Sequence, residues 1–240
     1  MLLSHAKAAK LYRDQFWAIQ GVVGIVVNSF MFEPYQDNEA DREAVNRALA
    51  FSTAWVLDPL TYGYYPPEMR LYHGNEFPSF SPEEIELVKG SLDFLGYVNT
   101  TGEREGIPIG DRTTMERFFV VPLGMEKIMD YVTRRYPGMP IFVTENGYSS
   151  PGEQENGNDV LQGVERIKFH KAYLAALARA IRKGADVRGY FIWSLMDGFD
   201  WIHAYSVRFG LYYINRRTLE RIPKLSARRY GDFLRGKGTI

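Results

Sequence analysis

The sequence predicts an α/β fold built on a parallel sheet, and three observations lead to this prediction. Short β-branched and aromatic runs alternate with longer amphipathic segments of helical period, which is the pattern of βαβ units. The first such run, Val22–Val27, is apolar without interruption, as expected for a strand buried on both faces of a parallel sheet. The length of 240 residues suits a single domain of the larger kind, so residues 1–240 are expected to form one domain.

The chain should begin with a helix and then enter the sheet. Residues 4–20 place apolar side chains on one side and charged side chains mostly elsewhere, so they predict an amphipathic helix that ends before Gly21. The run Val22–Val27 follows as the first strand, and the polar Asn28 marks its end.

A second helix is expected over residues 38–57. Asn38 can cap its first turn, and Pro59 closes it, because proline cannot continue a helix without losing a hydrogen bond. Residues 62–67, which contain a glycine and two prolines, are then expected to be a loop.

A short third helix has the best-defined start in the chain. Ser81 can act as the cap, Pro82 occupies the first helical position, and Glu84 completes a capping box. This helix should end near Lys89 and lead into a second strand, Leu92–Tyr97.

The second half of the chain repeats the alternation. The elements expected there are, in order, a polar Gly-rich loop at 99–114, a helix at 122–136, a strand at 141–144, a loop at 149–158, the longest helix at 159–183, a strand at 187–193 and a closing helix at 226–234. The longest helix carries an apolar stripe of helical period and stops at Gly184.

The number of strands is low for the length. Four strands in 240 residues give about 60 residues per unit, whereas a complete (β/α)8 barrel of about 250 residues uses about 31 for each. Either strands remain unrecognised, or the chain is half of a larger barrel.

Composition excludes several function classes. Lys plus Arg and Asp plus Glu both total 29, and such a neutral chain lacks the one-signed field of a nucleic-acid binder or a polybasic membrane-surface protein. The absence of cysteine removes thiol catalysis, cysteine-zinc sites and iron–sulfur clusters. The four histidines lack metal-ligand spacing, and His170 is expected to be packed rather than ligating. No metal or cofactor, no nucleic-acid partner and no membrane span are therefore expected.

A glutamate at the end of the third strand is the first candidate site residue. Thr144-Glu145-Asn146-Gly147 follows an apolar run, and active sites of α/β barrels lie at the carboxyl ends of the strands. The alternative from the tetrapeptide alone is a glutamate that caps the following loop, and the two interpretations carry equal weight here.

A second candidate site follows the fourth strand, where two indoles and two carboxylates lie between Trp193 and Trp201. Indole faces stack on the apolar face of a sugar ring, and carboxylates accept hydrogen bonds from hydroxyl groups. The alternative is an aromatic plug of the core flanked by solvated acids.

These motifs together resemble the C-terminal half of glycoside hydrolase family 1, and the plant β-glucosidases above all. The resemblance rests on V-T-E-N-G, followed about 45 residues later by F-I-W-S-L-M-D-G-F-D-W-I-H-A-Y-S-V-R-F-G-L-Y-Y-I. The stretches S-H-A-K-A-x-x-L-Y-R, E-P-Y, D-P-L-x-x-G-x-Y-P-P-E-M and P-K-L-S-A match as well, so the likeness covers nearly the whole chain. It implies an incomplete (β/α)8 TIM barrel, formed by roughly the last four βα units with parallel strands.

The resemblance also implies roles for five residues. Glu145 matches the nucleophile of a retaining mechanism, Trp193 the tryptophan beneath the sugar, and Trp201 a tryptophan that donates to a sugar hydroxyl. Phe209 matches an aromatic near the exocyclic carbon of the sugar. Asp200 stands where the family has a glutamate that binds two sugar hydroxyls, and an aspartate is one methylene shorter. In the same stretch Gly198 replaces a usual asparagine and Ala204 a usual glycine.

Two parts of the family pattern are not found in these 240 residues. The acid of the family lies in an N-E-P motif upstream of the S-H-A-K-A helix, and Glu33-Pro34 matches a different stretch. Near Tyr97, relatives continue for a few dozen residues that hold a tyrosine bonded to the nucleophile, and Tyr97 is out of place by count. The chain is therefore expected to be inactive or nearly so.

Three functional hypotheses follow. The first is a β-glucosidase-like glycoside hydrolase that carries the nucleophile but lacks the acid/base half, with a small-molecule β-glucoside or related sugar as its partner. The second is a fragment that an N-terminal half or a second copy completes. The third is a non-catalytic sugar-binding or interaction module. The first residues show no export signal, but plant relatives are often secreted or vacuolar, so the compartment is left open.

Overall fold

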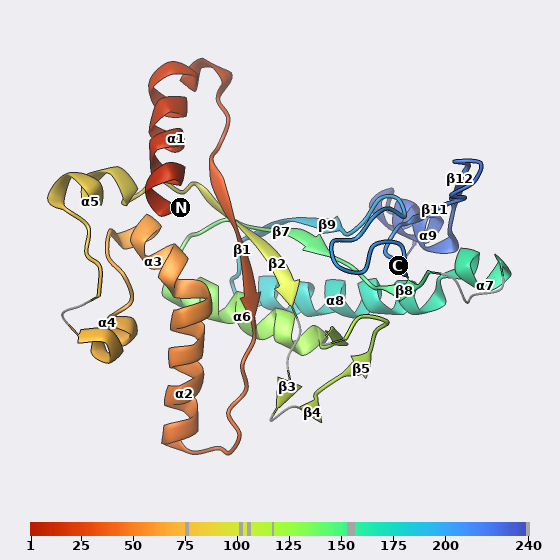
Figure 1. Cartoon of the computed structure of the whole chain (residues 1–240), viewed down its shortest axis with the longest axis horizontal. Helices are drawn as coiled ribbons and strands as arrows, with labels where there is room; N and C mark the ends of the chain where they lie inside the picture. The colour runs from red at the N-terminus through yellow and green to blue at the C-terminus, as the bar shows by residue number, and fades with distance from the viewer. Residues whose placement is uncertain (75–76, 101–102, 105–106, 117, 153–156, 239–240) are drawn as a thin grey trace.

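The computed structural model describes residues 1–74, 77–100, 103–104, 107–116, 118–152 and 157–238. At its centre lies a parallel sheet of four strands in the order β1-β2-β7-β9 (Figure 1). These strands are β1 Gly24–Phe30, β2 Phe94–Thr100, β7 Ile141–Asn146 and β9 Val187–Ile192. The four expected strands and their parallel pairing are thus confirmed. Two of their bounds are corrected: β1 continues past Asn28 to Phe30, and β2 continues past Tyr97 to Thr100, because the two strands stay paired with each other over these residues.

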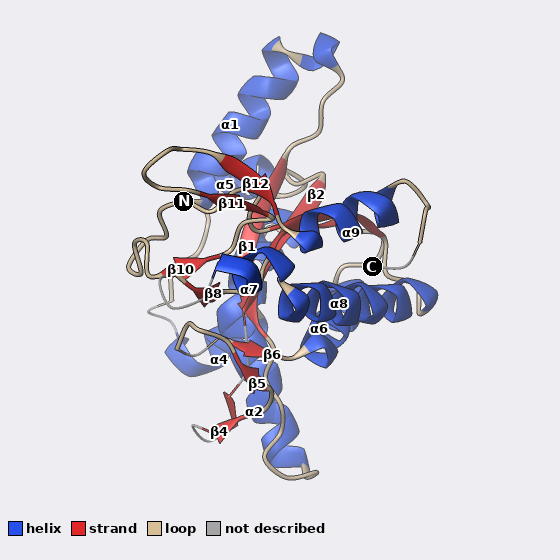
Figure 2. Cartoon of the chain, turned by 90° about the vertical axis from the view of Figure 1, so that its right-hand side faces the viewer, coloured by secondary structure: helices blue, strands red, loops and turns tan. Residues whose placement is uncertain are grey.

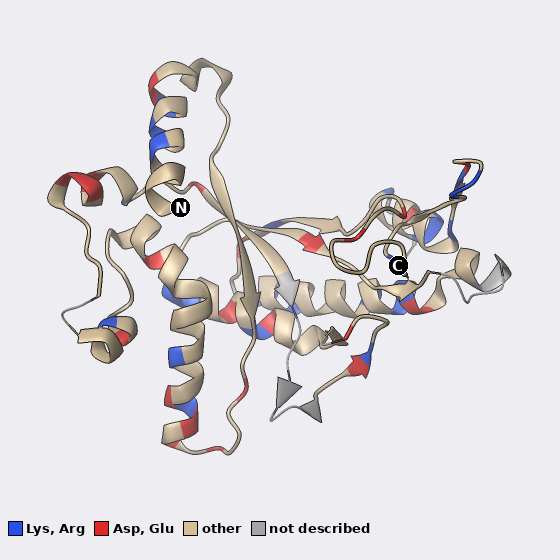
Figure 3. Ribbon diagram, viewed as in Figure 1, with Lys and Arg blue, Asp and Glu red and all other residues tan. Residues whose placement is uncertain are grey.

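Helices connect and flank the strands. They are α1 Leu2–Gln15, α2 Glu39–Leu49, α3 Trp55–Tyr62, α4 Pro67–His73, α5 Pro82–Val88, α6 Pro122–Arg135, α7 Gly157–Gln162, α8 Val164–Arg182 and α9 Leu225–Leu234. The capping box at α5 forms as expected, with the Ser81 hydroxyl accepting from the Glu84 amide and the Glu84 carboxylate accepting from the Ser81 amide. Basic and acidic residues are interspersed along α1 and α2 (Figure 3). Among the described helices, none has the length and apolar character that a bilayer crossing requires.

The core lies between the sheet and two of its helices. Figures 1 and 2 show α6 and α8 side by side along one face of the sheet. Their apolar stripes, which include Ile128, Met129 and Tyr173, are fully buried and belong to one cluster with Leu95 and Ile141 of the central strands. The apolar stripes that the sequence predicts for these two helices therefore pack against this face of the sheet.

The opposite face of β1 is open, which corrects the expectation of burial on both faces. Val27 and Ser29 are buried, whereas Val26 is 55% exposed and Phe30 is 44% exposed. Buried and exposed residues alternate along β1 because successive side chains of a strand point to opposite faces of the sheet. Among the described residues, helices cover only one of these faces.

The first two helices differ from the predicted bounds. The helix expected over 4–20 ends at Gln15, because the chain tightens into a 3-10 turn and Gln20 adopts the left-handed conformation with φ 55°. The amide of Gly21 then donates to the Tyr12 hydroxyl at 2.7 Å.

The helix expected to close before Pro59 instead continues to Tyr62 with Pro59 inside it. A π turn at Ala50–Ala54 precedes this segment, and the missing proline N–H would have bonded the carbonyl of Trp55, directly after that turn. The π turn has already shifted the backbone hydrogen bonds at this point, so Pro59 does not end the helix.

Two further expectations need correction. The loop expected over 62–67 ends in α4, because Pro67 supplies its first helical residue. The single helix expected over 159–183 is broken at Gly163, whose φ of 53° separates α7 from α8. The loops expected at 99–114 and 149–158 fall partly outside the described residues.

Short antiparallel pairs, which the sequence did not predict, occur in and beside these loops. They are β3 Glu103–Arg104 with β4 Ile107–Pro108, β5 Asp111–Arg112 with β6 Phe119–Val120, β8 Ser150–Pro151 with β10 Val207–Arg208, and β11 Tyr212–Ile214 with β12 Arg221–Pro223. Segments of two or three residues are too short to show a strand period.

Candidate active site

A cavity of about 380 Å³ opens at the carboxyl ends of the central strands. The strand register places its floor: Asn28 of β1 lies beside Val98 of β2, which lies beside Glu145 of β7. All three side chains line the cavity, as does Trp193, which directly follows β9. The remaining lining residues are Thr113, Met115, Phe118, Phe119, Asn146, Gly147, Phe169, Tyr173, Asp200, Trp201, Ile202 and Phe209.

Glu145 lines the cavity, and few neighbouring groups stabilise the negative charge of its carboxylate. Desolvation by the surrounding side chains raises the pKa of its carboxyl above the ordinary value. Within the described part of the chain, its carboxylate makes no hydrogen bond or ion pair. The side chain is therefore oriented by the strand end rather than held in a capping interaction of the following loop.

A polar network that the sequence did not reveal lies behind Glu145. The Asn146 amide donates to the Tyr190 hydroxyl at 2.9 Å, and this hydroxyl lies 2.8 Å from Nδ1 of His170. Burial, followed by the charge of Arg166, lowers the pKa of His170 to about 3, so the ring is neutral. His170 is 1% exposed, so the prediction that it is packed is confirmed. Among the described residues, no group of three or more acids and histidines lies close enough together to hold a metal ion.

Trp193 and Phe209 approach the strand end that carries Glu145. The Asn146 carbonyl accepts from the Trp193 amide at 2.9 Å. A Cβ at Gly147 would lie 2.0 Å from the Trp193 carbonyl oxygen and 3.2 Å from Cδ1 of Phe209, so only glycine permits this approach. Phe209 is 8% exposed and Trp193 is 37% exposed. The two predicted aromatics thus meet in one cavity with the predicted carboxylate.

The turn after Trp193 brings Asp200 and Trp201 to the same cavity. Asp200 is nearly buried, whereas Trp201 is 85% exposed. The amide of Asp200 donates to the Ala204 carbonyl at 2.8 Å, which closes the turn. Ala204 has φ 48°, a left-handed conformation that favours glycine, and this explains why a glycine is the residue expected there.

The two carboxylates of the Trp193–Trp201 segment separate in the structure. Asp200 faces the cavity, but Asp197 is turned into a buried cluster with Arg208 and Lys224. The sequence does not distinguish the two acids, because their spacing does not show which side of the turn each carboxylate faces.

Two side chains considered in the sequence have other partners. Both oxygens of Glu33 accept from Nζ of Lys127, at 2.6 and 2.7 Å, and Glu33 is not among the residues that line the cavity in the described structure. Tyr97 is 1% exposed, and its hydroxyl donates to the Ser29 carbonyl at 3.4 Å.

Comparison with protein families gives a match to glycosyl hydrolase family 1 over residues 1–105 and 98–239. The two matched segments overlap at 98–105, next to Leu95–Val98, where the sequence predicts that the chain is shorter than its relatives. The chain is 40% identical over 268 aligned positions to coniferin β-glucosidase of Pinus contorta, covering 98% of this chain and 52% of that protein. It is 40% identical to β-glucosidase 47 of Arabidopsis thaliana, covering 98% of this chain and 46% of that protein.

Solved structures agree with the sequence comparison. A β-glucosidase of the fungus Humicola insolens in complex with glucose superposes with a TM-score of 0.91 at 33% identity, over 99% of this chain and 56% of that one. A rice β-glucosidase, Os3BGlu6, superposes with a TM-score of 0.88 at 37% identity, over 95% of this chain and 54% of that one. The chain spans about half the length of the relatives it matches, so its open parallel sheet is an incomplete (β/α)8 barrel. The chain belongs to glycosyl hydrolase family 1.

Proposed function

We propose that residues 1–240 form one partial-barrel domain that carries the nucleophile side of a retaining β-glucosidase site. In this proposal Glu145 attacks the anomeric carbon of a β-glucoside and forms a glycosyl–enzyme intermediate. The observation that carries it is the position of Glu145, which lies at a strand end and lines a cavity with Trp193 and Phe209. The names of the relatives, a coniferin β-glucosidase among them, support a β-glucoside as the substrate class.

The other cavity residues fit the binding of one sugar ring. The indole of Trp193 offers an apolar face on which the ring can stack, and Phe209 closes the side next to it. The carboxylate of Asp200 can accept hydrogen bonds from sugar hydroxyls, and the indole N–H of Trp201 can donate one. Because Asp200 is shorter than the glutamate expected there, we infer a weaker hold on these hydroxyls.

The general acid is the part that these residues do not supply. A retaining glycosidase needs a second carboxyl group about 5–5.5 Å from the nucleophile to protonate the leaving oxygen. Among the described residues, Glu145 and Asp200 are the only carboxylates that line the cavity, and Asp200 is assigned to sugar binding in this proposal. Glu33 is occupied by Lys127. We therefore infer that the 240-residue chain acts only on glucosides that need no acid.

The dependence of rate on the leaving group tests this proposal. We expect a burst of dinitrophenol from 2,4-dinitrophenyl β-glucoside, whose phenolate departs unprotonated, followed by slow turnover, because the missing carboxyl would also act as the base that activates water against the intermediate. We expect no detectable turnover of cellobiose, because general acid catalysis contributes about 10²–10⁴-fold. Spectrophotometric and glucose-release assays on the purified chain measure the two rates. Cellobiose hydrolysis at the rate of a complete β-glucosidase would contradict the missing acid.

The pH dependence should reflect one ionisation. Desolvation raises the pKa of Glu145, and only the carboxylate form can attack. We therefore expect the rate on the dinitrophenyl glucoside to rise with pH through this raised pKa and then to stay constant up to neutral pH. A complete enzyme also loses rate on the alkaline side as its acid deprotonates, but only on substrates whose leaving group needs a proton. On the dinitrophenyl glucoside, a bell-shaped profile in a stopped-flow assay would therefore show that a second ionising group takes part in the attack.

A non-catalytic sugar-binding module is the second candidate, because the aromatic side chains of the cavity do not depend on an acid. Calorimetry with glucose and cellobiose separates the two functions. Heat of binding without release of dinitrophenol would favour the binding module, whereas the absence of heat at millimolar sugar would exclude it.

A further inference from the structure

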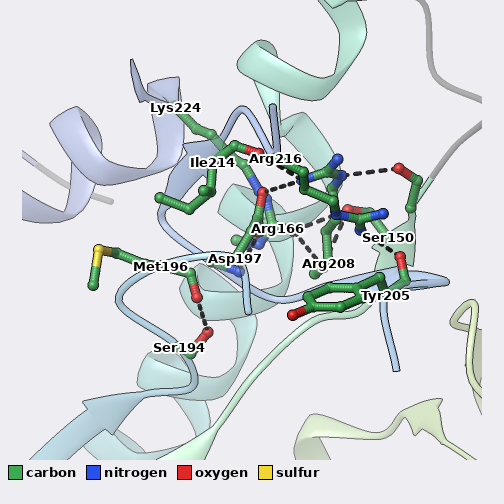
Figure 4. Close-up of polar contacts among 12 residues, drawn as sticks. Ser150, Arg166, Ser194, Met196, Asp197, Tyr205, Arg208, Ile214, Arg216 and Lys224 are labelled. Atoms are coloured by element: carbon green, nitrogen blue, oxygen red, sulfur yellow. Dashed lines mark hydrogen bonds and ion pairs between the residues drawn. The ribbon is translucent and has the colours of Figure 1, made fainter. Parts of the chain in front are cut away.

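The loop that follows β9 contains a buried acid that faces away from the cavity. Asp197 is 8% exposed, and its carboxylate lies between Lys224 and Arg208 (Figure 4). Nothing in the proposed chemistry uses this group. Its neighbours on the same loop, Trp193 and Asp200, do line the cavity.

Both oxygens of this carboxylate are occupied. Oδ1 accepts from Nζ of Lys224 and from the amide of Gly210, each at 2.8 Å. Oδ2 accepts from Nη1 of Arg208 at 3.0 Å. The backbone amide of Asp197 donates to the Tyr212 carbonyl at 2.9 Å, so main chain and side chain bind the same neighbouring segment.

The two charged partners of Asp197 come from two further segments of the chain, and one of them is held by a third. Arg208 belongs to β10, and its Nε donates to the Gly152 carbonyl at 3.0 Å, beyond the strand that carries Glu145. The Arg208 carbonyl accepts from Nη2 of Arg166 in α8 at 3.1 Å. Lys224 is the residue that precedes α9 and is completely buried. One carboxylate therefore joins the loop after β9 to β10 and to the final helix.

The approach of the two backbones at this point is unusually close. A Cβ at Gly210 would lie 2.1 Å from the Asp197 amide nitrogen and 2.7 Å from Oδ1. Any larger residue at this position would push the loop after β9 away from the segment between β10 and β11, although it would leave every charge in place. Gly210 is also the residue next to Phe209, so the spacing here sets where that ring lies.

We propose that Asp197 is a positioning residue, which fixes the Trp193–Trp201 loop against β10 and so sets Trp193 and Phe209 at their places beside Glu145. The role of these aromatics in sugar binding rests on the proposed function, whereas the fixing of the loop does not. Removal of one partner from a buried ion pair leaves the other charge uncompensated, so the loop cannot keep its place when Asp197 is neutral.

Two variants and one matched control test this proposal. Asp197→Asn removes the charge but keeps an acceptor, and Gly210→Ala keeps the charge but prevents the close approach. The control is Asp58→Asn, which neutralises an equally buried carboxylate that pairs with Arg135 away from the cavity. All three variants are compared with the parent chain at the same fraction folded.

Hydrogen exchange followed by mass spectrometry is the first measurement, because it needs no bound sugar. We expect amides in peptides over 193–212 to exchange about tenfold faster or more in Asp197→Asn and in Gly210→Ala, relative to peptides of β1 and β2. In Asp58→Asn the exchange of these amides relative to the peptides of β1 and β2 should stay within about twofold of the parent's ratio, because any loss of global stability affects both sets of peptides. Equal exchange in Asp197→Asn and Asp58→Asn would overturn the proposal.

The rate at which an activated 2-fluoro β-glucoside labels Glu145 is the second measurement. We expect it to fall by about 100-fold in Asp197→Asn and in Gly210→Ala, since a displacement near 1 Å has that effect on a reacting geometry. Asp58→Asn should stay within about twofold of the parent. An unlabelled parent chain would contradict the proposed function, and hydrogen exchange alone would then decide the positioning role. Parent-like labelling in Asp197→Asn would overturn the role at the cavity.

Discussion

Replacement of Glu145 by glutamine is expected to lower dinitrophenol release from the activated β-glucoside by about 10⁴-fold or more. The carboxamide has the shape of the carboxylate, but it is neutral and cannot form the glycosyl ester. Because no acid assists this substrate, loss of the nucleophile removes the covalent route completely. A spectrophotometric assay of variant and parent at the same pH measures the effect.

The matched control is Glu33→Gln. This carboxylate is also partly buried, but it pairs with Lys127 and does not line the cavity in the described structure. We expect its rate to stay within about twofold of the parent. Equal rates for Glu145→Gln and the parent would show that another group performs the attack.

Replacement of Asp58 by alanine should cause the largest loss of stability, about 3–5 kcal/mol in the free energy of unfolding. Asp58 is 1% exposed and accepts from Nε and Nη2 of Arg135 at 2.9 and 2.6 Å, and from the Tyr136 hydroxyl at 2.6 Å. Alanine would leave Glu68, at 3.0 Å, as the one carboxylate partner of the guanidinium among the described residues, and would leave the buried Tyr136 hydroxyl without its acceptor. Urea unfolding followed by circular dichroism measures the change.

An exposed carboxylate provides the comparison. Asp14 pairs with Lys10 across one helical turn at 2.8 Å, and both side chains are more than half exposed. Asp14→Ala should therefore change the free energy of unfolding by only about 0.3–0.5 kcal/mol. A loss for Asp58→Ala that is no larger than this would mean that the Arg135 cluster contributes little to the fold.

The sequence predicts most of what the backbone does at the site. The apolar runs before Asn28 and Glu145 identified two strands, although β1 continues two residues past Asn28, and parallel pairing brings both residues to the same edge of the sheet. Trp193, Asp200, Trp201 and Phe209 line the same cavity, as the order of motifs suggested. Strand period and strand ends are local properties, so they can be read from adjacent residues.

The remaining features depend on contacts between distant segments. Asp197 and Asp200 look alike in the sequence, and the partners that Asp197 finds on other segments, Arg208 and Lys224, distinguish it from the acid that faces the cavity. The apolar run in β1 predicts a strand that is buried on both faces, as it would be in a complete barrel. Val26 is exposed because one face of this sheet is open in the described structure. The break at Gly163 was missed because apolar residues keep their helical period on both sides of it.

Mass spectrometry of the chain after incubation with 2,4-dinitrophenyl 2-deoxy-2-fluoro-β-glucoside tests the central claim most directly. The 2-fluoro group slows hydrolysis of the intermediate, and the good leaving group removes the need for an acid. We predict one fluoroglucosyl group per chain, on the peptide that contains Glu145, and none in Glu145→Gln. An adduct on a different residue, or no adduct on the folded chain at neutral pH, would contradict the assignment of Glu145 as the nucleophile.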